Sequence, residues 1–201
     1  MNISPFKSLL AKHNSQPRRS ILPGLLLVAL ALAVIASGAL AAGGNLVKNG
    51  SFEKDGSGDG IPNNWTSYLL AASDKRVCNQ SYSGDCSFKM VGGGGTSDKL
   101  IYQGLPSSIA GGAGDAYTLK MWVKTKDLAS GTGFATIYLV LYKTGGGSDQ
   151  AAVNITDGTS GWALYTVDLT TTETYAGGVV QVEFYHNTGK IWLDKVKLIG
   201  P

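Results

Sequence analysis

The chain is predicted to fold as an all-β domain, an antiparallel β-sandwich or jelly roll, and three observations lead to this prediction. Five segments in its second half are rich in β-branched and aromatic residues and alternate with a period of two. Clusters of Gly, Asn, Ser and Asp separate these segments. Beyond residue 42, no segment has a convincing helical period. Many short strands joined by turns are typical of sandwiches and jelly rolls.

Residues 1–42 are expected to precede the fold as a signal peptide or membrane anchor, with an apolar helix at its centre. Residues 1–20 hold four basic side chains and no acidic one, and residues 21–42 are uncharged and almost wholly apolar. The small-residue ending Ala39-Leu40-Ala41 is typical of a cleaved signal peptide. A retained anchor is the alternative, because about 20 apolar residues can cross a bilayer. Either interpretation places the remainder, residues 43–201, outside the cytoplasm, secreted or at the cell surface.

The charge of the domain changes once this segment is set aside. The chain has 17 basic and 14 acidic residues, and four of the basic ones lie in the first 42 residues, which leaves 13 against 14. A nearly neutral domain whose sequence shows no basic stripe is a poor candidate for binding nucleic acid. Its length allows one well-buried core.

The domain opens with NLVKNGSFE, residues 45–53, which is expected to form the first strand. The next segment, KDGSGDGIPNNW, is expected to be an exposed turn. Asp55, Ser57 and Asp59 imitate the first ligands of an EF-hand loop, but position 12 of that loop would be Thr66, and no helices flank it. The segment also lacks the Lys-Ser/Thr ending of a phosphate-binding loop.

Cysteine usage agrees with export. Cys78 and Cys86 are the two cysteines of the chain, in CNQSYSGDC, and are expected to form a disulfide that closes a short loop. Two free thiols are the alternative. With one histidine beyond the N-terminal segment, His186, they do not make a closed zinc site of the usual kind.

Five strands follow from the alternating pattern: residues 116–125, 133–143, 162–171, 178–188 and 189–200. Because successive side chains of a strand point to opposite sides, the pattern also assigns faces. The side chains expected in the core are Tyr117, Leu119, Met121, Val123, Ile137, Leu139, Leu141, Val180, Val182 and Phe184. Trp65, Trp162 and Trp192 are also expected to be core residues.

The opposite faces of these strands carry aromatic and polar side chains that suit a polyhydroxylated ligand. Aromatic planes stack on the C–H groups of a sugar ring, and polar side chains bond its hydroxyl groups. The candidate ligand-binding residues are Tyr138, Tyr142, Tyr185, Trp122, Gln181, Glu183 and Lys124. A solvated sheet face, or a face covered by a loop, would show the same pattern.

Several motifs, in order, resemble a known family. NLVKNGSFE, DGIPNNW, SYSGDCSFKM, IYQGL, AYTLKMWVKT, GWALYTVDLT and GKIWLDKVKL are similar to motifs of the carbohydrate-binding modules of the galactose-binding-like jelly-roll superfamily, of the type attached to xylanases and related glycosidases. The resemblance spans nearly all of residues 45–199. It implies a two-sheet jelly roll with a structural calcium ion and, in many members, a glycan site on the concave sheet or in the end loops.

The same resemblance implies which residues hold the calcium ion. In similar modules the glutamate that ends the opening motif and an aspartate near the chain end share one ion with main-chain carbonyl groups. Here these residues are Glu53 and Asp194, with the carbonyl group of Ser51 as a further donor. Lys195 replaces a frequent second aspartate. The alternative is that both acids are ordinary surface residues or that the site stays empty.

The expected function is therefore that of an exported, non-catalytic carbohydrate-binding module that recognises a polysaccharide or glycan by aromatic stacking. The main alternative is a structural or adhesive cell-surface domain that uses the same fold for contacts with protein or for self-assembly. An enzyme is disfavoured, because no serine elbow accompanies His186 and no suitably spaced pair of carboxylates is evident for a glycosidase.

Overall fold

The computed structural model describes residues 44–93, 98–131, 133–185 and 188–201. The expected signal peptide or anchor, residues 1–42, lies outside the described residues, and so does His186. Across the described ranges, the structure contains no helix that is long and apolar enough to span a membrane.

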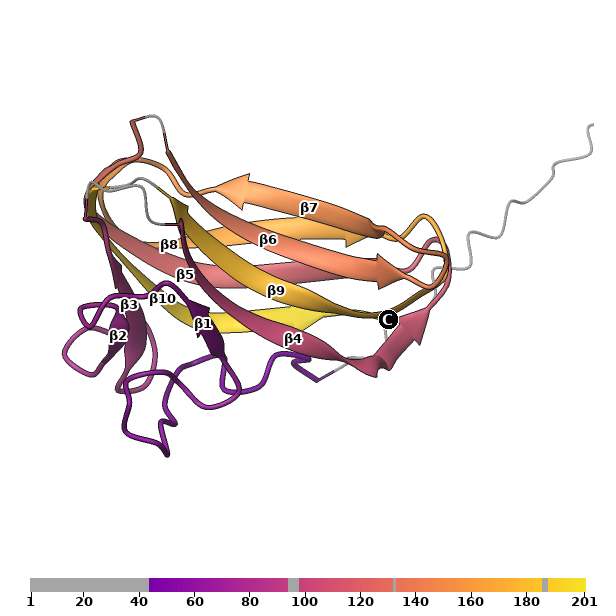
Figure 1. Cartoon of the computed structure of the whole chain (residues 1–201), viewed down its shortest axis with the longest axis horizontal. Helices are drawn as coiled ribbons and strands as arrows, with labels where there is room; N and C mark the ends of the chain where they lie inside the picture. Colours follow the sequence, from indigo (N-terminus) through magenta and orange to yellow (C-terminus); the bar gives the residue numbers. More distant parts are fainter. Residues whose placement is uncertain (1–43, 94–97, 132, 186–187) are drawn as a thin grey trace, which may run out of the picture. The chain divides into compact units, whose positions relative to one another are not determined.

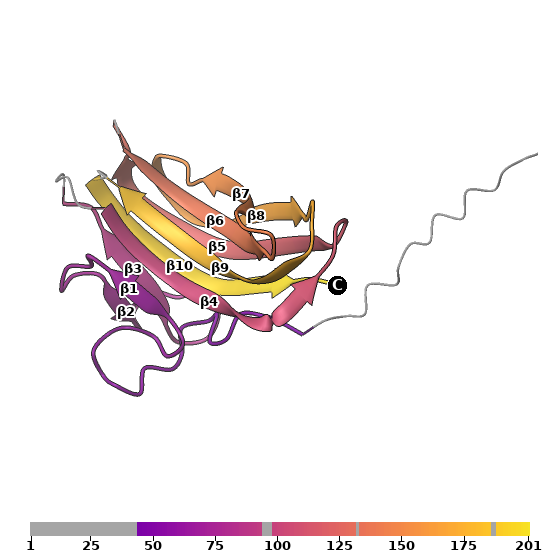
Figure 2. The ribbon, with the colours of Figure 1, turned by 45° about the vertical axis from the view of Figure 1, so that its right-hand side comes forward.

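The domain is a sandwich of two antiparallel five-stranded sheets (Figures 1 and 2). Sheet A has the strand order β1-β4-β9-β6-β7, and sheet B has the order β2-β3-β10-β5-β8. The strands are β1 (Thr66–Tyr68), β2 (Lys75–Val77), β3 (Ser87–Val91), β4 (Asp98–Gly111), β5 (Ala116–Ala129), β6 (Phe134–Lys143), β7 (Ser148–Asn154), β8 (Gly158–Thr170), β9 (Tyr175–Tyr185) and β10 (Thr188–Ile199). Both figures show β1, β2 and β3 gathered with their connecting loops along one side of the sandwich.

The predicted fold class and the five predicted strands are confirmed, and they correspond to β5, β6, β8, β9 and β10. The ten predicted core residues are also confirmed, because each is at most 4% exposed and lies between the sheets. Burial of each such aliphatic or aromatic side chain stabilises the fold by about 1.5–3 kcal/mol.

The expected first strand at residues 45–53 is wrong. This segment forms turns, in which Asn49 and Phe52 have φ angles of 48° and 56°, outside the extended region of a regular strand. It is held instead against the end of β10: Leu46 N donates to Leu198 O at 3.0 Å, and Val196 N donates to Gly50 O at 2.8 Å. A β-bulge interrupts β10 between Asp194 and Lys197 at this point.

The following turn satisfies its own polar groups, as expected for an exposed turn. The Asp55 carboxylate accepts hydrogen bonds from the Ser57 hydroxyl and from the amides of Gly58 and Gly60 at 2.9–3.1 Å. Asp59 accepts from the amide of Ile61 at 2.7 Å. Its carboxylates therefore fold the turn locally.

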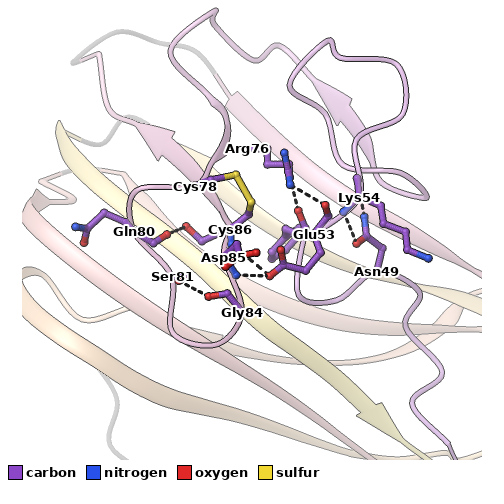
Figure 3. The surroundings of a disulfide bond; sticks show 12 residues. Asn49, Glu53, Lys54, Arg76, Cys78, Gln80, Ser81, Gly84, Asp85 and Cys86 are labelled. Carbon is purple, nitrogen blue, oxygen red and sulfur yellow. Dashed lines mark hydrogen bonds between the residues drawn. A yellow bond between two sulfur atoms is a disulfide. The ribbon is translucent and has the colours of Figure 1, made fainter.

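The predicted disulfide between Cys78 and Cys86 is confirmed, and it closes a loop that lies on the outer face of sheet B (Figure 3). We refer to residues 78–86 as the disulfide loop. Trp192 is buried at 8% exposure on this outer face, outside the core cluster. Trp65 is a core residue as predicted, whereas Trp162 is only half-buried and belongs to the outer face, so its core assignment is wrong.

A buried ion pair fixes the start of β4 against β3. Lys99 Nζ lies 2.8 Å from Asp74 Oδ2, and the two side chains are 9% and 0% exposed. Asp74 also accepts the amides of Ala71 and Val91 at 2.7 Å, and Lys99 donates to the carbonyl group of Val91 at 2.6 Å. The pair therefore joins three segments at one end of the domain.

Candidate functional site

Five tyrosines lie on the outer face of sheet A, and we refer to them as the tyrosine face: Tyr68, Tyr102, Tyr138, Tyr142 and Tyr185. The strand register places them together, since Tyr102 and Tyr138 both pair with Gln181 of the central strand β9. Tyr68 pairs with Leu100, which pairs with Glu183, two residues from Gln181 along β9 and on the same face. Tyr138 and Tyr142 are four residues apart on β6, about 13 Å along the strand. Aromatic rings thus lie over four adjacent strands.

Tyr68 and Tyr142 are the most exposed rings of this face, at 56% and 49%. Between them a shallow hollow of about 220 Å³ is lined by Tyr68, Leu100, Tyr102, Tyr142, Val179 and Gln181. A hollow with aromatic walls and an amide at its base offers ring faces for stacking and polar atoms for hydroxyl groups.

Polar side chains lie in the middle of the face. Gln181 Nε2 donates to Glu183 Oε1 at 3.0 Å, and this bond fixes the orientation of the Gln181 amide group. Burial, together with the nearby Asp98 carboxylate, raises the pKa of Glu183 above its usual range. Burial and the Glu183 carboxylate likewise raise the pKa of the Tyr138 hydroxyl, which stays protonated at neutral pH. The face therefore presents hydroxyl, amide and carboxylate groups beside the rings.

The structure brings together Tyr138, Tyr142, Tyr185, Gln181 and Glu183 of the candidate ligand-binding residues. It adds Tyr68, Leu100 and Tyr102 from β1 and β4, which the sequence reasoning missed. The alternation of Leu100, Tyr102 and Gly104 with Ile101 and Gln103 was the available signal, but β1 has only three residues and offers no periodicity.

The expected grouping of Trp122 and Lys124 with the tyrosines is wrong, because β5 belongs to sheet B. Trp122 lies on the outer face of that sheet, where the Tyr82 ring stacks on it with 3.8 Å between centroids and 12° between planes. Lys124 Nζ donates to Gln80 Oε1 at 2.6 Å. The disulfide loop thus covers both side chains.

Glu53 and Asp194, the expected calcium ligands, both bind the disulfide loop (Figure 3 shows Glu53). Glu53 Oε1 accepts the amides of Asp85 and Cys86 at 3.0 and 3.3 Å. Asp194 Oδ2 accepts the amides of Tyr82 and Ser83 at 2.7 and 2.9 Å. Glu53 lies near the start of the domain's sequence and Asp194 near its end, and both carboxylates meet at this one loop.

Asp194 is fully buried, and its pKa is raised by that burial, with a smaller contribution from the negative charge of Glu53. Within the described ranges, neither carboxylate has a Lys or Arg nitrogen within 4.0 Å, and Glu53 Oε2 accepts no hydrogen bond. Two carboxylates are oxygen ligands of the kind that a hard divalent cation prefers, and Glu53 Oε2 is the oxygen that accepts no hydrogen bond from the described residues. Ser51 is half-buried two residues before Glu53. Among the described side chains, no cluster of three or more His, Cys, Asp or Glu residues is arranged for a metal.

A family model described as "Carbohydrate binding domain" matches residues 44–189. A search of curated proteins finds no match.

Solved structures share the fold. A family 16 carbohydrate binding module-2 is 18% identical with a TM-score of 0.57, and the match covers 77% of this chain and 99% of that one. The CBM22-1 xylan-binding domain from Paenibacillus barcinonensis Xyn10C is 16% identical with a TM-score of 0.55 and coverage of 79% and 96%. A Stig cyclase, Fisc, from Fischerella sp. TAU is 14% identical with a TM-score of 0.60 and coverage of 80% and 98%. At these identities the likeness shows the fold alone, which both binding modules and a cyclase use.

Proposed function

This chain belongs to the carbohydrate binding domain family, and we propose that its tyrosine face binds a polysaccharide or glycan chain without cleaving it. The observation that carries the proposal is the row of Tyr102, Gln181 and Tyr138 across β4, β9 and β6, flanked by the exposed rings of Tyr68 and Tyr142. Tyrosine rings separated by about 13 Å along a strand suit an extended chain that contacts more than one sugar ring.

Absence of catalysis is part of the proposal. The hollow is open and shallow, so it does not exclude water from a reacting bond. Asp98 and Glu183 are neighbouring carboxylates on this face. A glycosidase uses a pair of carboxylates, so this pair is where catalysis should be tested. Polysaccharides that the protein binds should release no new reducing ends on prolonged incubation. Release that disappears in Glu183→Gln would show a glycosidase instead.

Export is proposed on the sequence of residues 1–42 together with the disulfide, which persists in oxidising compartments. The chain would then act outside the cytoplasm, either free or held at the membrane by its N-terminal segment. N-terminal sequencing of the protein recovered from its host distinguishes a cleaved from a retained segment.

The binding proposal is tested first by a glycan array and by affinity electrophoresis in gels that contain xylan and other plant, microbial and host polysaccharides. For a retained polysaccharide, Tyr142→Ala should weaken binding about 10-fold, since the change removes one stacking ring worth about 0.5–1.5 kcal/mol together with its buried apolar contact. The matched control is Leu164→Ala, which removes a side chain of similar exposure, 46%, from the opposite sheet and should leave binding unchanged.

Two results would contradict this assignment of the site. If Tyr142→Ala and Leu164→Ala weakened glycan binding equally, sheet A would have no specific role in binding. Retention by no glycan at all would favour a structural or adhesive domain that contacts protein.

We also propose that Glu53 and Asp194, with the carbonyl group of Ser51, hold a structural calcium ion. The proposal is supported by two carboxylates that bind one loop without a cationic partner. The ion would neutralise their charges and tie both ends of the domain to the disulfide loop.

Removal of calcium by a chelator should lower the melting temperature by about 5–10 °C. This follows because an ion present at 100 times its dissociation constant adds about 2.7 kcal/mol to a domain of this size. Asp194→Asn should abolish the response to the chelator, whereas Asp55→Asn, in the exposed turn, should retain it. An unchanged melting temperature together with no calcium in elemental analysis would overturn the proposal.

A further inference from the structure

The outer face of sheet B collects most of the positive charge of the domain. Eight of the 13 basic residues beyond residue 42 lie there: Lys75, Lys89, Lys120, Lys124, Lys126, Lys190, Lys195 and Lys197. They come from β2, β3, β10 and β5, and we refer to them as the lysine face. The sequence shows no basic stripe because these residues are spread over some 120 positions, and only the strand register aligns them.

The register sets lysines directly opposite one another. Lys75 pairs with Lys89, Lys126 with Lys190, and Lys120 with Lys197. Like charges directly opposite on neighbouring strands destabilise a sheet. Three such pairs on one face are therefore not explained by folding.

These charges are also uncompensated within the domain. Across the residues that the structure describes, none of the eight ammonium groups has a carboxylate within 4.0 Å. Three carboxylates lie beside them in the same sheet, and each has another partner: Asp194 is buried against backbone amides, Asp168 accepts the Thr118 hydroxyl at 2.6 Å, and Asp127 accepts the Thr159 hydroxyl at 3.1 Å. The face therefore attracts an anion from outside.

Three aromatic residues of this face cover one another, whereas on sheet A the stacked pair of Phe134 and Tyr185 is accompanied by the exposed rings of Tyr68 and Tyr142. Tyr82 covers one face of Trp122, and the Lys195 ammonium lies 5.4 Å from the Tyr82 ring centre. Trp162 meets Tyr82 edge to face at 6.1 Å. Rings that are already stacked in this way are poor platforms for a neutral sugar, so charge and not stacking selects the ligand.

We propose that the lysine face is a second binding site, for an acidic polysaccharide whose sugars carry carboxylates. Lys120 and Lys126 span about 20 Å along β5, one on each side of Trp122 and Lys124, which the disulfide loop covers. Lysines on β10 run beside them, so an extended chain with repeated carboxylates that passes along this loop meets an ammonium group at several points. The family match indicates that the ligand is a carbohydrate polymer, and the lysines indicate that this polymer is negatively charged. The site is on the other sheet from the tyrosine face and does not depend on it.

An anionic membrane fits this face less well. Binding at a membrane surface requires inserted apolar area besides charge. Tyr82 and Leu164 are the large apolar side chains exposed on the described part of this face, at 38% and 46%. Nucleic acid carries the same sign of charge as an acidic polysaccharide, and the family match favours the polysaccharide, so duplex DNA serves as a competing ligand in the test.

The test measures retardation of the purified chain by polygalacturonate in affinity electrophoresis, as the ratio of mobility with and without polymer. Retardation should be strong at low ionic strength and lost at about 0.5 M salt, since exposed charges are screened. The variant Lys120→Thr with Lys197→Thr should bind about 30-fold more weakly, on the basis of about 1 kcal/mol for each lysine at an anionic surface. Its melting temperature should be no lower than that of the parent, because one opposed pair is removed.

The matched control is Lys48→Thr with Lys54→Thr, which removes two exposed lysines from outside this face and should change binding less than about 2-fold. Tyr142→Ala should leave polygalacturonate binding intact, which separates this site from the tyrosine face. The proposal is overturned if both double variants weaken binding equally, if neither does, or if phosphatidylserine vesicles or duplex DNA bind at least as tightly as polygalacturonate.

Discussion

Asp74→Ala is expected to lower the free energy of unfolding by about 3–5 kcal/mol, among the largest effects of any polar substitution in this domain. The change leaves the Lys99 ammonium group buried without its counter-charge and removes the acceptor of the Ala71 and Val91 amides. Removing one partner of a buried ion pair carries a cost of this size, because the remaining charge is desolvated and unpaired. Urea or thermal unfolding of the variant measures it.

The matched control is Glu173→Ala, which removes the carboxylate of a Lys143 pair at 3.3 Å whose glutamate side chain is 60% exposed. An exposed pair contributes between about 0 and 1 kcal/mol, so this variant should remain close to the parent. Replacing both buried partners, in Asp74→Leu with Lys99→Met, should restore much of the loss. If Asp74→Ala unfolds like Glu173→Ala, water reaches the pair and the fold does not depend on it.

The sequence predicted the long strands well because their signal is local. In β5, β6 and β9 the alternation of apolar and polar residues indicates which side chains are buried, and all ten core residues predicted in this way are buried. The three-residue strands β1 and β2 have no period to read. The opening motif has no such period either, since its apolar residues are Leu46, Val47 and Phe52, and Asn49 and Phe52 turn the backbone.

Alternation within a strand does not state which sheet the strand joins. Trp122 and Tyr138 both point outward, and the sequence therefore grouped them, although β5 and β6 lie in different sheets. The same limit hid the lysine face, since Lys75 and Lys197 come onto one sheet face only through the pairing of β2, β3 and β10. Long-range pairing decides the composition of a surface, and no local pattern encodes it.

The two sheets consequently carry different chemistry. The outer face of sheet A offers tyrosine hydroxyl groups, an amide and the carboxylates of Glu183 and Asp98, whereas the outer face of sheet B offers ammonium groups. The proposed ligand of the first is a neutral, hydroxyl-rich chain held by stacking and hydrogen bonds, and the proposed ligand of the second is a polyanion held by charge. Under these two proposals, one small domain holds two polymers together.

Phe52→Ala is the second substitution with a large expected effect, a loss of about 3–5 kcal/mol. Phe52 is fully buried, with its ring centre 5.0 Å from that of Trp65 and 6.0 Å from that of Phe88. Its carbonyl group accepts the Nε of Arg76 at 2.7 Å, so the same residue fixes β2. For a domain of this size the loss corresponds to a fall in melting temperature of about 10 °C or more.

Phe52→Leu provides the control, because it keeps most of the buried volume and should cost only about 1–2 kcal/mol. Below its melting temperature Phe52→Ala should still bind glycan, since the tyrosine face is built on β4, β6 and β9. Under the calcium proposal, its response to a chelator should be smaller than that of the parent, because Glu53 is the next residue and depends on the same backbone turn. A variant with near-parental stability would mean that the opening segment only rests on the sandwich, and the positive φ of Phe52 would then have no structural purpose.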